Sequence, residues 1–207
     1  MMTQFYVNQI GFRVFSETDS LVELGVDSVL LRLYKIQAQS KIQSAGLYHF
    51  AILVPERKDL AEILLSLYQK GLLTGASDHG YSEALYFNDP EGNGIEIYCD
   101  KDKAEWEIHD DGTIVGVTKE LDADDVLSLV KKPFVHLPSG TIIGHVHLMV
   151  HDLKETQSFY ETLGFLKKYD YGQKAIFMAI GTYHHHLGAN IWHGTLPKRE
   201  KDQLGLR

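Results

Sequence analysis

The sequence has little of several features that mark well-known classes of protein. Its 207 residues include one cysteine, Cys99, so no disulfide can form within the chain, and this fits a reducing cytoplasm. No apolar run approaches the roughly 18 residues that a membrane-spanning helix needs. The start, MMTQFYVNQ, lacks the basic and apolar regions of a signal peptide. Net charge is −8 without a Lys/Arg cluster, so we expect neither nucleic acid nor a membrane as partner.

Several catalytic signatures are also missing. There is no GKS/T phosphate loop, no GxSxG motif, and no arrangement of Cys and His that suggests a thiol nucleophile. These absences argue against a P-loop nucleotide hydrolase and against a serine or cysteine hydrolase. What remains is the composition of an ordinary globular protein, with 44% hydrophobic and 23% charged residues. Cys99 itself is more typical of a small strand residue than of a reactive thiol.

The stretch SDHGYSEALYFNDPEGNGIEIY, residues 77–98, predicts a β-hairpin that carries chemistry. A strand-like run at 83–87 is followed by NDPEGNG, in which Pro fixes φ and the two Gly accept positive φ. In the second strand, alternation puts Ile95 and Ile97 on one face and Glu96 on the other. A carboxylate on the inner face of a strand is costly unless it is paired or bound to a metal, so Glu96 predicts a nearby cation.

The chain contains an internal repeat of about three strand–helix–strands units. FYVNQIGF at 5–12 resembles FYETLGF at 159–165, and each reads as a helix end stopped by Gly before a strand. A strand at 46–54 and an amphipathic helix at 58–70 open the second unit. In the third unit, a strand at 141–150 precedes a helix that Asp152 can cap, with Glu155 three residues later.

We therefore divide the chain into an incomplete first βαβββ module (1–45), a second module (46–100), an acidic linker with a helix at 123–131 (101–140), a third module (141–193) and a polar tail (194–207). The first module lacks its opening strand. A missing strand leaves exposed sheet edges, so we expect a homodimer.

These strings together resemble the vicinal oxygen chelate superfamily, which includes glyoxalases, bleomycin resistance proteins and extradiol dioxygenases. The resemblance implies an α+β fold in which repeated βαβββ modules form cupped mixed β-sheets. Within the superfamily, GLYHFAI, DHGYSEALY, DPEGNGIEIY, IGHVHL and YHHHLGANIW resemble bacterial catechol 2,3-dioxygenase-like proteins with four modules. Against that template the chain lacks the first strand of module one and all of module four, as a shortened homologue or a fragment.

The resemblance implies a metal held by two His and one Glu, which leaves one face of the ion open. His49 and Glu96 match the ligands that the second module supplies. The module that would normally supply the other His lacks its opening strand, so His145 in the third module is the expected third ligand. His147 lies on the same strand face and is a candidate for lining the same cup. The implied metal is Fe(II), with Mn(II) or another divalent ion as alternatives, at a site between modules two and three, within one chain or across a dimer.

Further residues match positions around that metal. His79 corresponds to a histidine that contacts oxygen or substrate, and its alternative is a turn histidine beside Gly80. Tyr86 falls near a tyrosine that orients the catechol, although the spacing differs by two residues. His186 or His185 matches the acid–base histidine, and the alternative is a strand-edge cluster. For Phe177 and Trp192, core packing is favoured over a wall of the substrate cup. Four histidines match no motif and are expected at the surface or in linkers: His109, His136, His151 and His193.

The resemblance implies an enzyme, an oxidoreductase that cleaves the ring of a small aromatic diol with O2 beside its hydroxyls. Two other readings stay open. One is a glyoxalase-like metal-dependent lyase, isomerase or transferase of the same superfamily, which commonly uses an additional carboxylate or Gln ligand. The other is an inactive shortened homologue that acts as a binding module.

Overall fold

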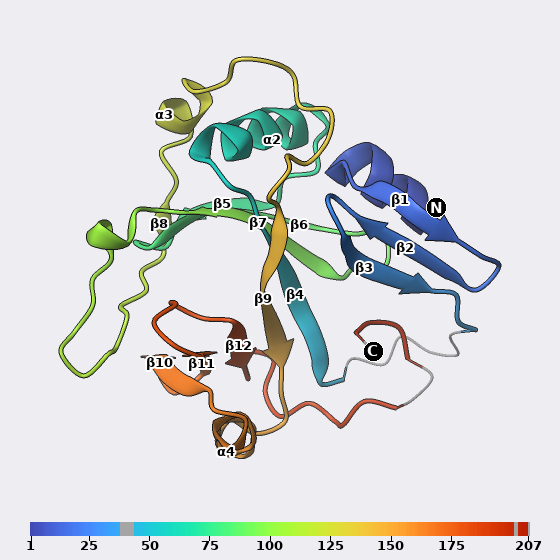
Figure 1. The fold of residues 1–207 in the computed structure, drawn as a ribbon. Helices are drawn as coiled ribbons and strands as arrows, with labels where there is room; N and C mark the ends of the chain where they lie inside the picture. The colour runs from blue at the N-terminus through green and yellow to red at the C-terminus, as the bar shows by residue number, and fades with distance from the viewer. Residues whose placement is uncertain (38–43, 201–202, 207) are drawn as a thin grey trace.

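The computed structural model describes residues 1–37, 44–200 and 203–206. They form a small sheet of order β1-β2-β3 and a large one of order β10-β11-β12-β9-β4-β7-β6-β5-β8 (Figure 1). The N-terminal part comprises α1 (Met2–Phe5), the π-helical turn η1 (Tyr6–Ile10), β1 (Arg13–Glu17), β2 (Leu21–Gly25) and β3 (Val29–Tyr34). The middle part comprises β4 (Gly46–Leu53), α2 (Arg57–Gln69), β5 (Gly75–Asp78), β6 (Ser82–Asn88) and β7 (Gly94–Asp100). Next come η2 (Lys103–Glu105), β8 (Lys119–Glu120), α3 (Ala123–Leu127), β9 (Ile142–Met149), α4 (Leu153–Thr162), β10 (Leu166–Tyr171), β11 (Ala175–Ala179) and β12 (Leu187–Asn190).

Strands β4 and β9 form the centre of the large sheet, where they run antiparallel. Each also pairs in parallel with a later strand, β4 with β7 and β9 with β12. The two opening strands of the second and third units therefore lie side by side within one chain. In this register, His49 lies opposite His147, and Ala51 lies opposite His145. The pairing thus brings side chains distant in sequence to one face of the sheet.

Helix α2 covers the opposite face of the sheet (Figure 1). Leu60, Ile63, Leu64 and Leu67 recur at helical spacing and are buried in the main core. Burying each such side chain stabilises the fold by about 1.5–3 kcal/mol. Glu56 and Asp59 cap the start of the helix reciprocally, and Gly71 follows its end with φ of +66°. The expected helix at 58–70 therefore agrees with the structure to within one residue.

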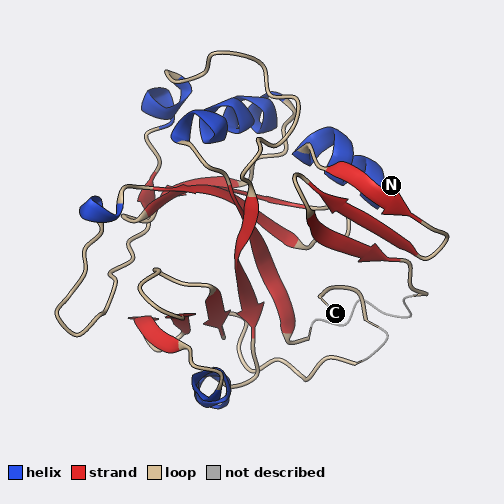
Figure 2. Cartoon of the chain, viewed as in Figure 1, coloured by secondary structure: helices blue, strands red, loops and turns tan. Residues whose placement is uncertain are grey.

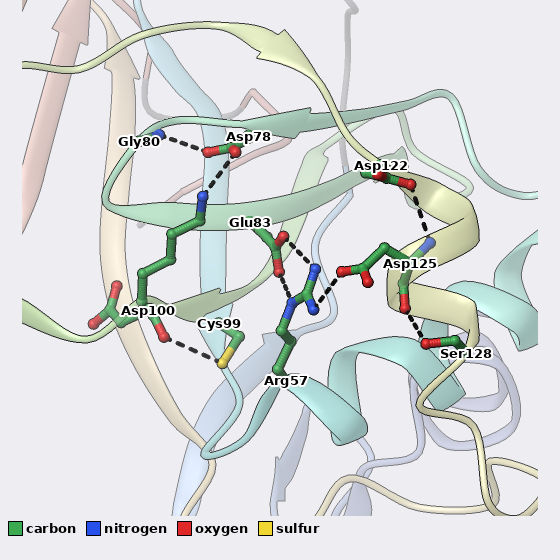
Figure 3. Close-up of polar contacts among 10 residues, drawn as sticks. Arg57, Asp78, Gly80, Glu83, Cys99, Asp100, Asp122, Asp125 and Ser128 are labelled. Atoms are coloured by element: carbon green, nitrogen blue, oxygen red, sulfur yellow. Dashed lines mark hydrogen bonds and ion pairs between the residues drawn. The ribbon is translucent and has the colours of Figure 1, made fainter. Parts of the chain in front are cut away.

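Arg57 fixes the start of α2 to the sheet and to α3 (Figure 3). Its Nε and Nη2 donate to the two carboxylate oxygens of the buried Glu83 on β6, at 2.6 and 2.8 Å. Nη1 of the same residue, Arg57, lies 2.7 Å from Asp125 Oδ2. Near this cluster, burial raises the pKa of the Cys99 thiol to about 12. Cys99 is therefore a protonated strand residue, as the sequence indicated.

The segment between β7 and β9 is mostly irregular (Figure 2). The helix expected at 123–131 is shorter, because its hydrogen bonds change from four-residue to three-residue spacing after α3. Ser128 N donates to Asp124 O, whereas Leu129 N donates to Val126 O. None of the helices in the described part of the chain is long and apolar enough to cross a membrane.

Candidate metal centre and its pocket

Three buried side chains converge from three adjacent strands of the large sheet. His49 on β4 places its Nε2 3.0 Å from Glu96 Oε2 on β7, and His145 on β9 places its Nε2 3.2 Å from the same oxygen. The two Nε2 atoms are 3.3 Å apart. Each of the three residues is at most 6% exposed. The structure thus brings together the three residues that the sequence named as ligands.

The triangle of donor atoms has the size that a divalent metal requires. An ion bound octahedrally at about 2.1 Å has neighbouring ligand atoms about 3.0 Å apart. The observed edges are 3.0, 3.2 and 3.3 Å. The Nε2 atoms of His49 and His145 both face the Glu96 carboxylate, which only accepts, so without a metal both nitrogens carry hydrogen and cannot hydrogen-bond to each other. A metal in place of those hydrogens satisfies both nitrogens. The donor set of two His and one carboxylate suits Fe(II), and its geometry fits.

The pKa shifts of Glu96 and His145 also suit metal binding, which needs an ionised carboxylate and neutral imidazoles. Burial raises the pKa of Glu96, but His145 and His49 more than offset it and hold this pKa well below its usual value. Burial lowers the pKa of His145 despite the opposing effect of Glu96. His145 Nδ1 is buried and has no hydrogen-bond partner among the described residues. Its ring is positioned instead by packing, with His185 at 4.1 Å and Tyr98 at 5.0 Å between ring centroids.

A cavity of about 260 Å³ opens onto the triad. It is large enough for one aromatic ring with small substituents, since a cavity of about 150 Å³ can hold benzene. Aromatic side chains dominate the wall: Tyr48, Tyr81, Tyr169, Tyr171, Phe177 and Trp192. Phe177 and Trp192 were expected in the core, and this was wrong, because both face the cavity and Trp192 is 41% exposed. No Lys or Arg lines the cavity in the described part of the chain.

His79 and Tyr86 form a hydrogen-bonded pair on the cavity wall. His79 Nδ1 lies 2.7 Å from the carbonyl oxygen of Val117, and its Nε2 lies 2.6 Å from the Tyr86 hydroxyl. A carbonyl only accepts, so Nδ1 carries the hydrogen and, in the neutral ring, Nε2 accepts from Tyr86. Burial raises the pKa of Tyr86 well above its usual value, so its hydroxyl stays protonated. Both sequence-named residues therefore lie beside the triad.

The remaining histidines that the sequence named differ in whether they line the cavity. His185 is buried in the cavity wall, but His186 is exposed and lies outside it. Both residues precede β12, which begins at Leu187. Of the two residues that the sequence offered, the structure places His185 in the cavity wall and His186 outside it, and the catalytic role of either stays a prediction. His147 does line the cavity, and its Nε2 accepts from Asn190 Nδ2 at 3.0 Å, which leaves that nitrogen occupied.

Comparisons with known proteins identify the family of this chain. A model of the Glyoxalase/Bleomycin resistance protein/Dioxygenase superfamily matches residues 1–97. A catechol-2,3-dioxygenase of Bacillus subtilis is 42% identical over 212 residues, which covers 98% of this chain and 74% of the relative. The chain belongs to this superfamily. A biphenyl-2,3-diol 1,2-dioxygenase 3 of Rhodococcus globerulus is 29% identical over 106 residues, 48% of this chain and 56% of that protein.

A solved structure of the glyoxalase/dioxygenase superfamily shows the same fold. Glyoxalase I from Zea mays superposes with a TM-score of 0.51 at 15% identity, over 90% of this chain and 61% of that one. The α+β fold of cupped mixed sheets, expected from the sequence, is confirmed. The division into modules with their stated boundaries stays a prediction.

Sequence reasoning missed part of the cavity wall. Gly116, Val117 and Thr118 line the cavity, although they belong to the segment interpreted as a linker. Tyr81 also lines it and stacks on His184 at 4.2 Å between ring centroids. No motif marks the linker residues, because their placement depends on an irregular segment that hydrogen-bonds to His79. Tyr81 lies inside the string DHGYSEALY and could have been singled out there.

Proposed function

We propose that this protein is a metal-dependent extradiol dioxygenase that cleaves a catechol-type ring with O2. The observation that carries the proposal is the His49–Glu96–His145 triangle at the base of an aromatic-walled cavity of about 260 Å³. The 42% identity to a protein named catechol-2,3-dioxygenase supports it. A divalent metal in this triad, Fe(II) or else Mn(II), supplies a site where diol and O2 are oriented together and activated.

The surrounding side chains suit the proton chemistry of a diol. Burial lowers the pKa of His185 well below its usual value, so its ring is neutral and able to accept a hydroxyl proton. On the same wall, the Tyr86 hydroxyl donates its one hydrogen to His79 Nε2, which leaves the Tyr86 oxygen as a fixed acceptor for a substrate hydroxyl. We assign His185 as the acid–base residue and His79 with Tyr86 as the pair that positions the substrate.

The cavity favours a diol whose ring carries no charged substituent. The described wall holds no Lys or Arg that could pair with a substrate carboxylate. An unpaired anion would also lie close to the buried carboxylate of Glu96. Burying an unpaired charge is costly, so we expect catechol and alkyl catechols to be preferred over a carboxylated catechol.

The two other readings have less support. A glyoxalase-like site commonly adds a further carboxylate or Gln ligand. The described residues contain no second carboxylate in the triad, and Asn190 contacts His147 instead. An inactive binding module would not need a complete set of ligands. We also propose a homodimer and a cytoplasmic location, the latter supported by the lone cysteine.

The test is anaerobic purification with Fe(II), metal quantification, and an assay of O2 uptake and yellow product with catechol. We expect one metal per chain, stoichiometric O2 uptake, and a kcat/KM for catechol on the order of 10-fold or more above that for 3,4-dihydroxybenzoate. His49→Ala should lose both metal and activity, whereas the exposed His109→Phe should keep both. Stoichiometric metal without O2 uptake would favour the glyoxalase-like reading, and no metal at all would favour the binding module.

A further inference from the structure

Behind the cavity wall, a chain of hydrogen bonds leads from His185 to Asp100. His185 Nδ1 and His184 Nδ1 are 2.7 Å apart, and His184 Nε2 lies 2.9 Å from Asp100 Oδ1. Both rings are buried, at 5% and 2% exposure, while the Asp100 side chain is 24% exposed. Two consecutive hydrogen bonds therefore join a cavity histidine to a carboxylate near the surface.

The chemistry of the end group sets the direction of each bond. A carboxylate only accepts, so His184 Nε2 carries a hydrogen and donates it to Asp100. In the form of His184 that carries one ring hydrogen, that hydrogen lies on Nε2, so Nδ1 is bare and can only accept. The hydrogen between the two rings must consequently belong to His185 Nδ1. Because a neutral imidazole carries one hydrogen, the Nε2 of His185 is left bare.

Asp100 is held in place by a second set of contacts. Its Oδ2 accepts from the Tyr183 hydroxyl at 2.9 Å, and Tyr183 in turn accepts from Tyr98 at 2.8 Å. The Tyr98 hydroxyl lies where a side chain at position 144 would be, since a Cβ on Gly144 would come 1.8 Å from it. The ring of His184 is further fixed by stacking on Tyr81, with 12° between the ring planes.

We propose that Asp100 and His184 are positioning residues that fix the tautomer of His185, with hydrogen on Nδ1 and a bare Nε2 available to the cavity. The effect on rate rests on the proposed dioxygenase function, but the tautomer itself does not. A bare Nε2 is the form that accepts a substrate proton, and the wrong tautomer of a catalytic histidine can lower kcat about 10⁴-fold in enzymes that orient it with a carboxylate. Neither Asp100 nor His184 belongs to the metal triangle or lines the cavity in the described part of the chain, and His184 reaches the cavity wall through His185 and Tyr81.

The direct test is ¹⁵N NMR of the histidine rings in the metal-free protein, with the His185 signals assigned by their loss in His185→Gln. We expect the Nδ1–H tautomer of His185 in the wild type. In His184→Phe, which keeps a ring to stack on Tyr81, the Nδ1–H population should fall. Asp100→Ala, at a partly exposed position, should shift it in the same direction. An Nε2–H tautomer in the wild type, or an unchanged tautomer in both variants, would overturn the proposal.

Kinetics supply the second readout. With Fe(II) and catechol, His184→Phe should lower kcat by about 100-fold or more while KM and bound metal stay at their wild-type values. His109→Phe is the matched control on an exposed histidine. An active wild type together with an unchanged kcat in His184→Phe would refute the positioning role. A wild type without ring cleavage would refute the proposed function instead and leave the NMR result standing.

Discussion

Replacing Glu96 by Gln should separate the binding of a metal from the stability of the fold. The two side chains have nearly the same size, but Gln removes the one negative charge of the three predicted ligands. In the metal-free protein, Glu96 is a carboxylate with 3% exposure whose burial is more than offset by contacts with His49 and His145. Because a depressed pKa means that the ionised form stabilises the fold, we expect the metal-free variant to be less stable than the wild type at neutral pH, independently of any metal.

The magnitude follows from linkage. A metal at 100 times its Kd stabilises the folded state by about 2.7 kcal/mol. For a chain of this size, each kcal/mol moves Tm by about 2–4 °C. The wild type should therefore gain about 5–11 °C on adding metal at that level, and Glu96→Gln should gain almost nothing.

The assay is anaerobic calorimetry of both proteins with Mn(II) or Fe(II) and with a chelator. Glu17→Gln on the exposed strand β1 is the matched control and should keep the full rise in Tm. If Glu96→Gln shows the same metal-induced rise as the wild type, the metal binds elsewhere and the assignment of the triad is wrong.

Three further predictions concern single positions. His185→Phe should lower kcat by about 100-fold or more in O2-uptake assays, whereas His186→Phe, whose ring lies outside the cavity, should stay close to wild type; the reverse order would restore His186 as the acid–base residue. Gly144→Ala should lower the free energy of unfolding by about 1–3 kcal/mol in urea, because its Cβ would lie 1.8 Å from a tyrosine hydroxyl, and an unchanged midpoint would contradict that close approach. Arg57→Ala should lower it by about 3 kcal/mol, because the buried Glu83 would lose its partner, and a loss below about 1 kcal/mol would show that water replaces the arginine.

The three residues of the triangle could be predicted from the sequence, because strand alternation and the family resemblance mark them. Strand alternation marked Glu96 as an unusual inward carboxylate, and the resemblance pointed to His49 and His145. Whether the two units meet within one chain or across a dimer could not be predicted, since β4 and β9 pair over a long separation. The structure places that pairing within the chain.

The cavity wall was harder to predict because it depends on tertiary packing. The direction of each side chain in the run of three histidines depends on the path of the backbone just before β12. The sequence does not reveal that path, so it could not show whether His185 or His186 faces the cavity. The contact of His79 with the carbonyl of Val117 comes from a segment with no motif. Asp100 gave no signal either, because its partner His184 lies 84 positions away.

The junction of β4 and β9 makes metal affinity a measure of how far folding has gone. His49 and His145 are separated by 96 positions, and contacts between residues so distant form late and slowly. A species with only the second unit folded would hold two of the three ligands and would release the ion quickly. During stepwise denaturation, retained metal would therefore report that the two strands are still paired. Release of the metal would report their separation before any change in helix content is visible.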